Sequence, residues 1–201
     1  MSKKQPAAVS QVSSAETAIL ISLLQQVLAK NIAGDVVELG CYRGDTSVLF
    51  QHELQKTDKT LWLYDSFAGL PEKTREDSSA AGDQFKSGEL FVTKREVIEK
   101  FKRHNLPLPK IKKALFEDLD PISDLPNKIC FAFLDGDLYT SIKTSLTLVQ
   151  DKMQSGSIVI IHDYNNPELP GSARAVDEWL KNHPGKYPSF QVKETLVIIY
   201  F

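Results

Sequence analysis

Cysteine, methionine and tryptophan are scarce in this sequence, with two of each among 201 residues. Two cysteines, Cys41 and Cys130, are too few for a disulfide framework or a cysteine-rich metal site, and their apolar surroundings predict buried free thiols. No apolar run approaches the roughly 20 residues that span a bilayer. The first residues, MSKKQPAAVSQVSS, lack the apolar core and cleavage site of a signal peptide. These absences predict a cytoplasmic chain without a membrane partner.

An excess of charge of one sign is also missing. Lys and Arg number 24, Asp and Glu number 26, and the formal net charge is -2. This balance gives no global field that would draw the chain onto nucleic acid. The basic cluster at 94–113 carries Val97, Ile98 and Phe101 at helical spacing, which favours a solvated helix face over a phosphate-binding patch. The expected partner is a small molecule, and the sequence is compatible with a homo-oligomer.

Apolar residues alternate between strand and helix spacing along the chain, without an internal repeat or an interdomain linker. The predicted helices are 15–29, 47–54, 94–104, 140–153 and 173–182, and the predicted strands are 35–40, 60–64, 111–115, 128–134, 157–161, 190–194 and 195–201. Strands separated by helices predict parallel pairing with right-handed crossovers. The last two strands have no helix between them, which predicts an antiparallel hairpin at the sheet edge. We therefore expect a single α/β domain over residues 1–201, with a mostly parallel, seven-stranded, Rossmann-like sheet.

Two segments stand outside this alternation. Residues 1–13 are small and polar, so we expect them to be flexible, with Ser14 as the N-cap of the first helix. The stretch Glu72–Gly88 is rich in charge, Ser, Ala and Gly, and a loop this long in a compact domain is usually functional or disordered. We predict that it is a lid over the site, poorly ordered without ligands because it offers little to bury.

Acidic residues follow five of the predicted strands. In an open parallel sheet, ligands bind beyond the carboxyl ends of the strands, at the point where the strand order reverses. The acids at these ends are Glu38, Asp65, Glu117 with Asp118, Asp135 with Asp137, and Asp163, which follows His162. The capping of loops requires less polar chemistry than this, so these strand ends are the candidate site.

The first of these strands ends in a glycine turn, Gly40-x-x-x-Gly44, which lacks the third glycine of a dinucleotide-binding motif. Glu38 precedes the turn, where it would repel a pyrophosphate but accept hydrogen bonds from a cationic or hydroxylated ligand. An amino acid joined to a sulfonium and a ribose fits this turn better than NAD does. The alternative is a plain turn between strand and helix.

The next two strand ends suit the remainder of such a ligand. Asp65 is placed to accept hydrogen bonds from both ribose hydroxyls, or, with Ser66, to cap a turn. Phe116 offers an aromatic face near an adenine ring. Glu117 and Asp118 would add hydrogen-bond acceptors there, or would instead begin a short helix.

The last two parallel strands are predicted to bring Asp135 and Asp137 opposite His162 and Asp163. Oxygen and nitrogen ligands would then converge on one point. Carboxylate ligands favour Mg²⁺ or Ca²⁺, and an added imidazole ligand shifts the preference of the site toward Mn²⁺, Fe²⁺, Ni²⁺ or Zn²⁺. The alternatives are that Asp135 or Asp137 caps the helix near Thr140, and that His162 is a satisfied histidine beside the site.

In combination, these segments resemble the macrocin-type O-methyltransferases, class I S-adenosylmethionine-dependent enzymes that methylate sugar hydroxyls of antibiotics. The matching segments are VELGCYRGDT at 37–46, DSFAGLP at 65–71, FED at 116–118, FLDGDLY at 133–139, GSIVIIHDY at 156–164 and AVDE at 175–178. The resemblance implies that the cofactor is bound by Glu38, Gly40, Tyr42 and Gly44 at its methionine end, by Asp65 and Ser66 at the ribose, and by Glu117 and Asp118 at the adenine, with Asp135 beside it.

The resemblance also implies a divalent metal, usually magnesium, at Asp135 and at an acidic pair after the fifth strand. Here His162 replaces the first acid of that pair, so the implied metal ligands are Asp135, His162 and Asp163. The expected activity is methyl transfer from S-adenosylmethionine to a hydroxyl of a small molecule or sugar, with Asp135 and His162 at the reacting centre. Either a metal activates the hydroxyl, or His162 acts as the base without metal.

Two further expectations follow from the same resemblance. A protein that binds S-adenosylmethionine without turnover is the alternative from another functional class, because a fold does not guarantee a function. The chain is shorter than the antibiotic-tailoring members of the family. A smaller sugar, a polyol or an externally presented glycan is therefore the expected acceptor.

Overall fold

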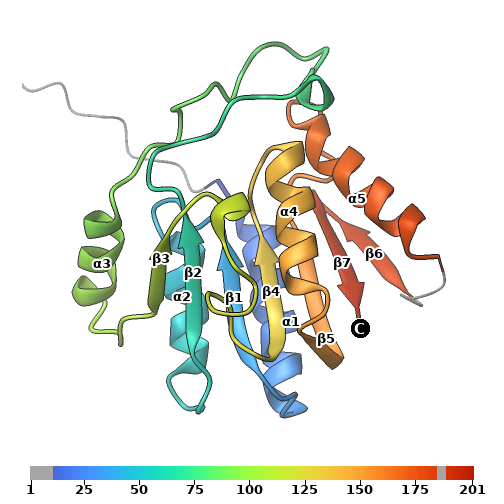
Figure 1. Ribbon diagram of the computed structural model, residues 1–201. Helices are drawn as coiled ribbons and strands as arrows, with labels where there is room; N and C mark the ends of the chain where they lie inside the picture. The colour runs from blue at the N-terminus through green and yellow to red at the C-terminus, as the bar shows by residue number, and fades with distance from the viewer. Residues whose placement is uncertain (1–10, 185–188) are drawn as a thin grey trace, which may run out of the picture.

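The computed structural model describes residues 11–184 and 189–201, and its strands form one seven-stranded sheet (Figure 1). The strands are β1 (Asp35–Leu39), β2 (Leu61–Asp65), β3 (Lys110–Lys113), β4 (Ile129–Leu134), β5 (Met153–Ile161), β6 (Phe190–Lys193) and β7 (Leu196–Tyr200). Their order is β3-β2-β1-β4-β5-β7-β6, with parallel pairing from β3 to β5 and antiparallel pairing of β7 with β5 and β6. The predicted α/β class, the mostly parallel sheet and the C-terminal hairpin at its edge are confirmed.

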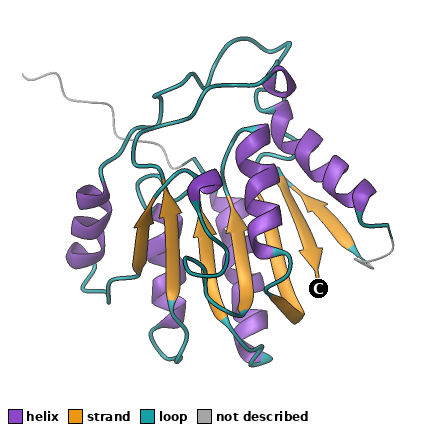
Figure 2. Cartoon of the chain, in the orientation of Figure 1, coloured by secondary structure: helices purple, strands orange, loops and turns teal. Residues whose placement is uncertain are grey.

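Helices cover both faces of this sheet (Figure 2). They are α1 (Ser14–Ala29), α2 (Asp45–Leu54), α3 (Lys94–Arg103), α4 (Tyr139–Val149) and α5 (Pro170–Asn182). One apolar cluster joins α1, α2 and α3 to the sheet, and a second joins α4 and α5 to the other face. Every residue of β4 is buried, as expected for a central parallel strand that is covered on both sides.

The start of α1 corrects one of the expectations from sequence. Its N-cap is Ser13 rather than Ser14: the Ser13 hydroxyl accepts a hydrogen bond from the Glu16 amide at 3.2 Å, and the Glu16 carboxylate accepts one from the Ser13 amide at 2.9 Å. This reciprocal pair is a capping box. Val12, near the end of the segment expected to be flexible, is 5% exposed and packs in the core. Residues 1–10 lie outside the described residues.

Several predicted boundaries shift where tertiary pairing decides them. The helix predicted at 140–153 ends at Val149, and Met153 instead begins β5 opposite Ile129 of β4. The strand predicted at 111–115 ends at Lys113, because the chain then turns into the 3-10 helix η2 (Phe116–Asp118). The helices predicted to begin at Ser47 and Ala173 begin at Asp45 and Pro170.

The basic helix α3 confirms the expected solvated face. Its buried residues are Val97 and Phe101, and Lys100 forms an ion pair with Asp45 at 2.6 Å on the surface. Cys41 and Cys130 are both buried and free, as predicted. Across the described residues, no helix combines the length and apolarity that a membrane span requires.

Candidate functional site

The carboxyl ends of β1 and β4 lie side by side where the strand order reverses, the position at which parallel sheets bind ligands. The Asp135 amide donates a hydrogen bond to the Leu39 carbonyl at 2.8 Å. This bond holds the carboxyl ends of β1 and β4 together. Gly40 has a φ of +90°, and a Cβ added there would lie 1.9 Å from the Asp135 carbonyl oxygen. Glycine is therefore required at this turn by both backbone conformation and space.

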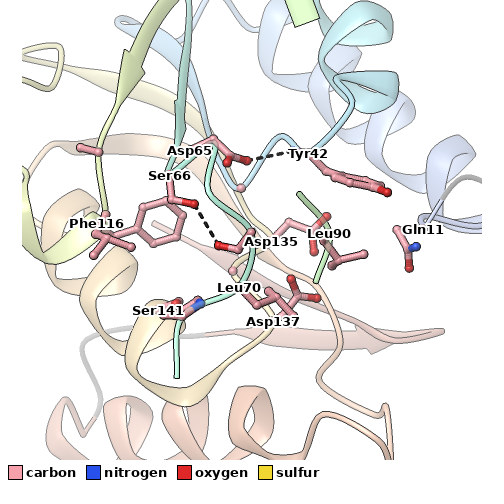
Figure 3. A pocket seen from close by; sticks show the side chains of 16 residues that line it. Gln11, Tyr42, Asp65, Ser66, Leu70, Leu90, Phe116, Asp135, Asp137 and Ser141 are labelled. Carbon is pink, nitrogen blue, oxygen red and sulfur yellow. Dashed lines mark hydrogen bonds between the residues drawn. The ribbon is translucent and has the colours of Figure 1, made fainter. Parts of the chain in front are cut away.

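A cleft of about 670 Å³, including space open to solvent, lies above these strand ends. Five of the residues predicted from sequence line it: Gly40, Tyr42, Asp65, Ser66 and Asp135. Figure 3 shows Phe116 on one side, Tyr42 and Gln11 on the other, and Asp135 and Asp137 between them. The cleft thus combines acidic and aromatic surfaces.

Four predicted cofactor-binding residues lie outside this lining: Glu38, Gly44, Glu117 and Asp118. Gly44 is the N-cap of α2 with a φ of +74°. Glu38 is 1% exposed, and its carboxyl group accepts a hydrogen bond from the Ser47 hydroxyl of α2. Burial raises the pKa of Glu38 to about 8. Its carboxyl group is therefore mostly protonated at neutral pH.

Asp65 organises the glycine turn. One carboxylate oxygen accepts hydrogen bonds from the amides of Cys41 and Tyr42, each at 3.0 Å, and the other accepts one from the Phe67 amide at 2.8 Å. These bonds confirm the turn-capping alternative. They fill three of the roughly four acceptor positions of a carboxylate. Ribose binding by Asp65 stays a prediction, and it would use the remaining position or displace an amide.

The part of the cleft that is predicted to bind adenine is lined by apolar residues rather than by the acids Glu117 and Asp118. Ala114, Leu115 and Phe116 line the cleft there, whereas Glu117 and Asp118 belong to the turn of η2. The alternative in which these two acids form a short helix is therefore confirmed. Phe116 offers the flat apolar surface against which a planar ring would pack.

The predicted metal ligands assemble behind the cleft. His162 Nδ1 lies 2.9 Å from Asp135 Oδ1 and 3.1 Å from Asp163 Oδ2, and the possible ligand atoms of the three residues all lie within 4.8 Å of one another. Asp135 lines the cleft, whereas His162 and Asp163 are buried. Burial alone would lower the pKa of His162, but the two aspartates outweigh it and raise this pKa to about 12. His162 Nδ1 and Asp135 Oδ1 are within hydrogen-bond distance, so the carboxylates favour a positive charge at Nδ1, either the proton of this hydrogen bond or a metal ion in its place.

Glu16 of α1 joins this cluster, and the sequence argument missed it. Its Oε1 atom lies 3.6 Å from His162 Nε2, on the opposite side of the ring from Asp135. Glu16 is 4% exposed. The spacing of Ser13 and Glu16 signals a capping box, but nothing in the local sequence places that helix end beside the fifth strand.

Asp137 is a second acid of this region that lines the cleft. It has a φ of +59°, and among the described residues no hydrogen bond to its carboxyl group is found. Burial and the charges of Asp135 and Asp163 raise the pKa of Asp137 well above its ordinary value. The alternative in which Asp135 or Asp137 caps α4 is wrong, because the Tyr139 amide donates instead to Asp77 at 2.7 Å.

Asp77 lies in the 3-10 helix η1 (Arg75–Asp77), in the first third of the predicted lid Glu72–Gly88. It is 2% exposed, and its other carboxylate oxygen accepts hydrogen bonds from the Thr74 amide and hydroxyl. The space it occupies exists because Gly171 has no side chain. In Figure 1 the segment arches over the strand ends and meets α5 at this point. The expectation that the lid buries little is therefore wrong at Asp77, while residues 78–88 are exposed or half-buried.

Because Asp77 is held by these hydrogen bonds, the two parts of the lid are expected to behave differently. Without ligands, the amides of 79–88 are expected to exchange quickly with solvent, and those near Asp77 slowly. Cofactor and acceptor together should protect the amides of 79–88 from exchange.

Asp77→Ala should speed exchange at the start of α4 and lower the free energy of unfolding by about 1 kcal/mol, as loss of a cap does. Asp83→Ala, at the exposed tip, should leave exchange in α4 unchanged. Hydrogen exchange read by mass spectrometry gives both results, and equal protection of 79–88 with and without ligands would contradict the lid.

Comparison with known proteins places the chain in a family. The sequence profile described as Macrocin-O-methyltransferase (TylF) matches residues 3–200. The chain belongs to the macrocin-O-methyltransferase family. This confirms the resemblance inferred from its strand-end motifs.

Two relatives of this macrocin-O-methyltransferase family member come from Streptomyces. Demethyldecarbamoylnovobiocin O-methyltransferase of Streptomyces niveus is 30% identical over 165 residues, which cover 78% of this chain and 62% of the relative. The 8-demethyl-8-(2,3-dimethoxy-alpha-L-rhamnosyl)-tetracenomycin-C 4'-O-methyltransferase of Streptomyces olivaceus is 31% identical over 150 residues, covering 70% and 57%. The chain thus matches less than two thirds of the length of each relative.

A solved structure supports the same placement. The O-methyltransferase NovP superposes with a TM-score of 0.82 at 25% sequence identity, covering 96% of this chain and 82% of NovP. The mostly parallel sheet and the antiparallel hairpin of this macrocin-O-methyltransferase family member are therefore those of an O-methyltransferase fold, as the sequence predicted.

Proposed function

We propose that this chain transfers the methyl group of S-adenosylmethionine to a hydroxyl of a small molecule or sugar. The observation that carries the proposal is the cleft at the reversal of strand order, where Gly40 and Asp135 meet. Both relatives compared above are named as O-methyltransferases, and one of those names contains a rhamnosyl group. A cleft at this position of a parallel sheet is where a cofactor would bind, with a small acceptor brought against it.

The cleft suggests how the cofactor would lie. Its amino-acid end would rest on the turn of Gly40 and Tyr42, with Glu38 buried behind the turn. Its ribose would lie near Asp65, and its adenine near Phe116. The sulfonium methyl group would then point toward Asp135, where the acceptor has to approach in line with the carbon–sulfur bond.

The donor set at Asp135, His162 and Asp163 fits a divalent cation. Two carboxylate oxygens stand about 3 Å from one imidazole nitrogen, a spacing typical of neighbouring ligands around one ion. Such an ion, when bound, would supply Lewis acidity that lowers the pKa of the acceptor hydroxyl. The imidazole favours Mn²⁺, Fe²⁺, Ni²⁺ or Zn²⁺ over Mg²⁺.

Asp137, rather than His162, is placed to take the hydroxyl proton. Both ring nitrogens of His162 face carboxylates, and the ring lies outside the cleft lining, whereas Asp137 lines the cleft. With a cation bound, the charges of Asp135 and Asp163 are offset, which leaves Asp137 able to accept a proton. The acceptor oxygen forms a bond to the methyl carbon, the carbon–sulfur bond breaks, and S-adenosylhomocysteine leaves.

The first test is cofactor binding and turnover. S-adenosylhomocysteine should bind with micromolar-scale affinity and raise the Tm, as any ligand selective for the folded state does. Glu38→Ala should abolish the shift, and S-adenosylmethionine with a panel of sugars and polyols should yield methylated product. Normal binding to the Glu38→Ala variant would overturn the role of the turn. Binding without product from any hydroxyl acceptor would favour a binding protein.

Cofactor binding should also release a proton from Glu38. Its pKa of about 8 in the free protein would fall once the cofactor's ammonium group lies nearby, because an opposite charge favours the ionised form. On the acid side of pH 8, where Glu38 of the free protein is protonated, binding therefore releases protons and affinity rises with pH. Calorimetry at pH 7 in buffers of different ionisation enthalpy measures the release. The matched variant Glu38→Gln keeps an acceptor for Ser47 but cannot ionise, so an undiminished release from it would contradict this assignment.

A further inference from the structure

We propose that a groove between α3 and the glycine turn binds a phosphate or diphosphate group of the methyl acceptor. This role rests on the proposed methyl transfer, because it names the class of acceptor: a sugar that carries a phosphate, as a sugar phosphate or as a nucleoside diphosphate sugar. The groove measures about 600 Å³, including space open to solvent. Four of the residues that line it are basic: Arg43, Arg95, Lys100 and Arg103.

The groove lies next to the cleft along two stretches of the chain. Tyr42 lines the cleft, and Arg43 lines the groove. In the segment before α3, Leu90 lines the cleft and Val92 lines the groove. The guanidinium carbon of Arg43 lies 5.1 Å from the centre of the Tyr42 ring, within the range of a cation–π contact. An acceptor with its hydroxyl at Asp135 would therefore extend past Tyr42 to place a second group in the groove.

Three arginines of the groove have charges that no ion pair offsets. Across residues 11–184 and 189–201, Arg43, Arg95 and Arg103 form no ion pair with a carboxylate. Lys100 differs from them, because it pairs with Asp45 at 2.6 Å. The planar fork of N–H donors on a guanidinium matches the oxygens of a phosphate, so three arginines around one groove favour a phosphorylated ligand.

The two acids of the groove have partners of their own. The Glu96 carboxylate accepts hydrogen bonds from the amide and the hydroxyl of Thr93, at the start of α3. Glu99 Oε1 lies 3.6 Å from Lys102 Nζ. With the ion-pair partners of the lining residues included, positive charges around the groove exceed negative charges by two. The groove is therefore locally cationic on a chain whose formal net charge is -2.

Arg43 distinguishes this groove from the solvated face of α3. It belongs to the glycine turn rather than to the basic cluster at 94–113, and it is half-buried, whereas Arg95 and Arg103 of α3 are exposed. Cations from two separate elements thus face one space. A solvated helix face requires no cation from a second element, so the position of Arg43 favours binding of an anion.

The experiment measures pyrophosphate binding to the full chain by titration calorimetry, with S-adenosylhomocysteine present to fill the cofactor site. Divalent metal is removed first, so that pyrophosphate does not bind through an ion at Asp135. Arg43→Gln should weaken pyrophosphate binding about 10-fold, because charge-assisted hydrogen bonds to phosphate are the strong ones. The double variant Arg95→Gln/Arg103→Gln should lose more. Arg43→Lys keeps the charge but not the planar fork, so its loss should be smaller than that of Arg43→Gln.

Lys56→Gln is the matched control. It also removes one positive charge, from an exposed residue just beyond the other end of α2. Lys56→Gln should bind pyrophosphate as the parent chain does. Higher salt should weaken binding to the parent chain, because salt screens exposed charges.

Glucose 1-phosphate and UDP-glucose distinguish the two sources of the phosphate. Tighter binding of glucose 1-phosphate would indicate a sugar phosphate, and tighter binding of UDP-glucose would indicate a nucleoside diphosphate sugar. With a phosphorylated acceptor that is methylated, Arg43→Gln should raise KM about 10-fold and leave kcat unchanged, because it removes an interaction made equally before and during the reaction.

The outcomes separate this groove from the proposed function. A parent chain that binds no pyrophosphate, arginine variants that bind it normally, or an equal loss in Lys56→Gln would each overturn the proposal. Methyl transfer to neutral sugars, with the same KM in the parent and in Arg43→Gln, would overturn it and leave the proposed function intact. Arginine-dependent pyrophosphate binding without methyl transfer to any hydroxyl would support the phosphate site and overturn the proposed function. Much tighter, arginine-dependent binding of a single-stranded RNA oligonucleotide would make the groove a nucleic-acid surface instead, against this proposal.

Discussion

Replacing Gly40 with alanine is expected to destabilise the protein by about 3–5 kcal/mol, through left-handed strain together with overpacking. The residue has a φ of +90°, and an added Cβ would lie 1.9 Å from the Asp135 carbonyl oxygen, a contact that forces β1 and β4 apart. The Asp135 carbonyl belongs to the backbone and the position of a Cβ is fixed by the backbone of residue 40, so no flexible side chain is able to move away. The cleft should widen, and S-adenosylhomocysteine should bind weakly to whatever fraction remains folded.

Gly88 provides the matched control for this substitution. It has a φ of +81°, and a Cβ added there meets nothing within 4 Å. Gly88→Ala should therefore cost only the backbone strain, about 1–2 kcal/mol. Urea unfolding of both variants against the parent chain measures the difference. Equal destabilisation would mean that backbone strain alone accounts for the Gly40 effect and that the contact with Asp135 is relaxed.

The fold was predictable because its signals are local and repeat along the chain. The burial of all six residues of β4 and the uninterrupted hairpin after α5 follow from periodicity alone. The element boundary and the helix cap that were predicted wrongly depend on residues far away in the sequence. Met153 became a strand residue because it pairs with Ile129, and α4 is capped by Asp77, 62 residues away in sequence. Neither neighbour is visible within a window of sequence.

In the candidate site, too, some features follow from local sequence signals and others depend on residues far away in sequence. Parallel strands bring their carboxyl ends to one edge, so the convergence of Asp65, Asp135 and Asp163 was predictable from topology. Successive side chains of a strand point to opposite faces of the sheet, so not all of these acids reach the cleft. Val37 and Leu39 point to the face covered by α4 and α5, so Glu38 points to the other face, where it meets Ser47 of α2. The same alternation was available from the sequence and would have placed Glu38 behind the turn.

Removal of divalent metal is expected to abolish methyl transfer while leaving cofactor binding intact. EDTA should eliminate product formation without changing the calorimetric affinity for S-adenosylhomocysteine, because His162 and Asp163 are buried behind the cleft and Asp135 lines it where the acceptor, rather than the ribose or the adenine, is proposed to lie. Added Mn²⁺ should restore turnover. This reversible loss separates a metal requirement from damage to the fold.

The substitution Asp163→Asn tests the ligand itself. Asp163 has a φ of +61°, a conformation that asparagine also tolerates, and its Oδ1 atom accepts a hydrogen bond from Asn166 at 2.8 Å. The backbone should therefore persist. An amide is a neutral, weaker ligand than a carboxylate, so Mn²⁺ binding and activity should fall more than about 100-fold, beyond the loss typical of an outer partner. Asp177→Asn, at an acid that accepts a hydrogen bond from the Tyr164 hydroxyl on the surface, is the matched control and should bind Mn²⁺ normally.

The exchange His162→Asp distinguishes the metal from a histidine base. With a third carboxylate, the cluster should shift its preference from Mn²⁺ or Zn²⁺ toward Mg²⁺ and keep its activity with that ion. If His162 is instead the base, activity should survive EDTA, rise toward alkaline pH because the two aspartates raise the pKa of His162 to about 12, and collapse in the His162→Asp variant. Activity that is indifferent to both EDTA and this exchange would contradict both mechanisms, because neither a metal nor the imidazole would then take part. The reacting centre would have to be sought at Asp137, the one acid of this region that faces the cleft without a hydrogen bond from the described residues.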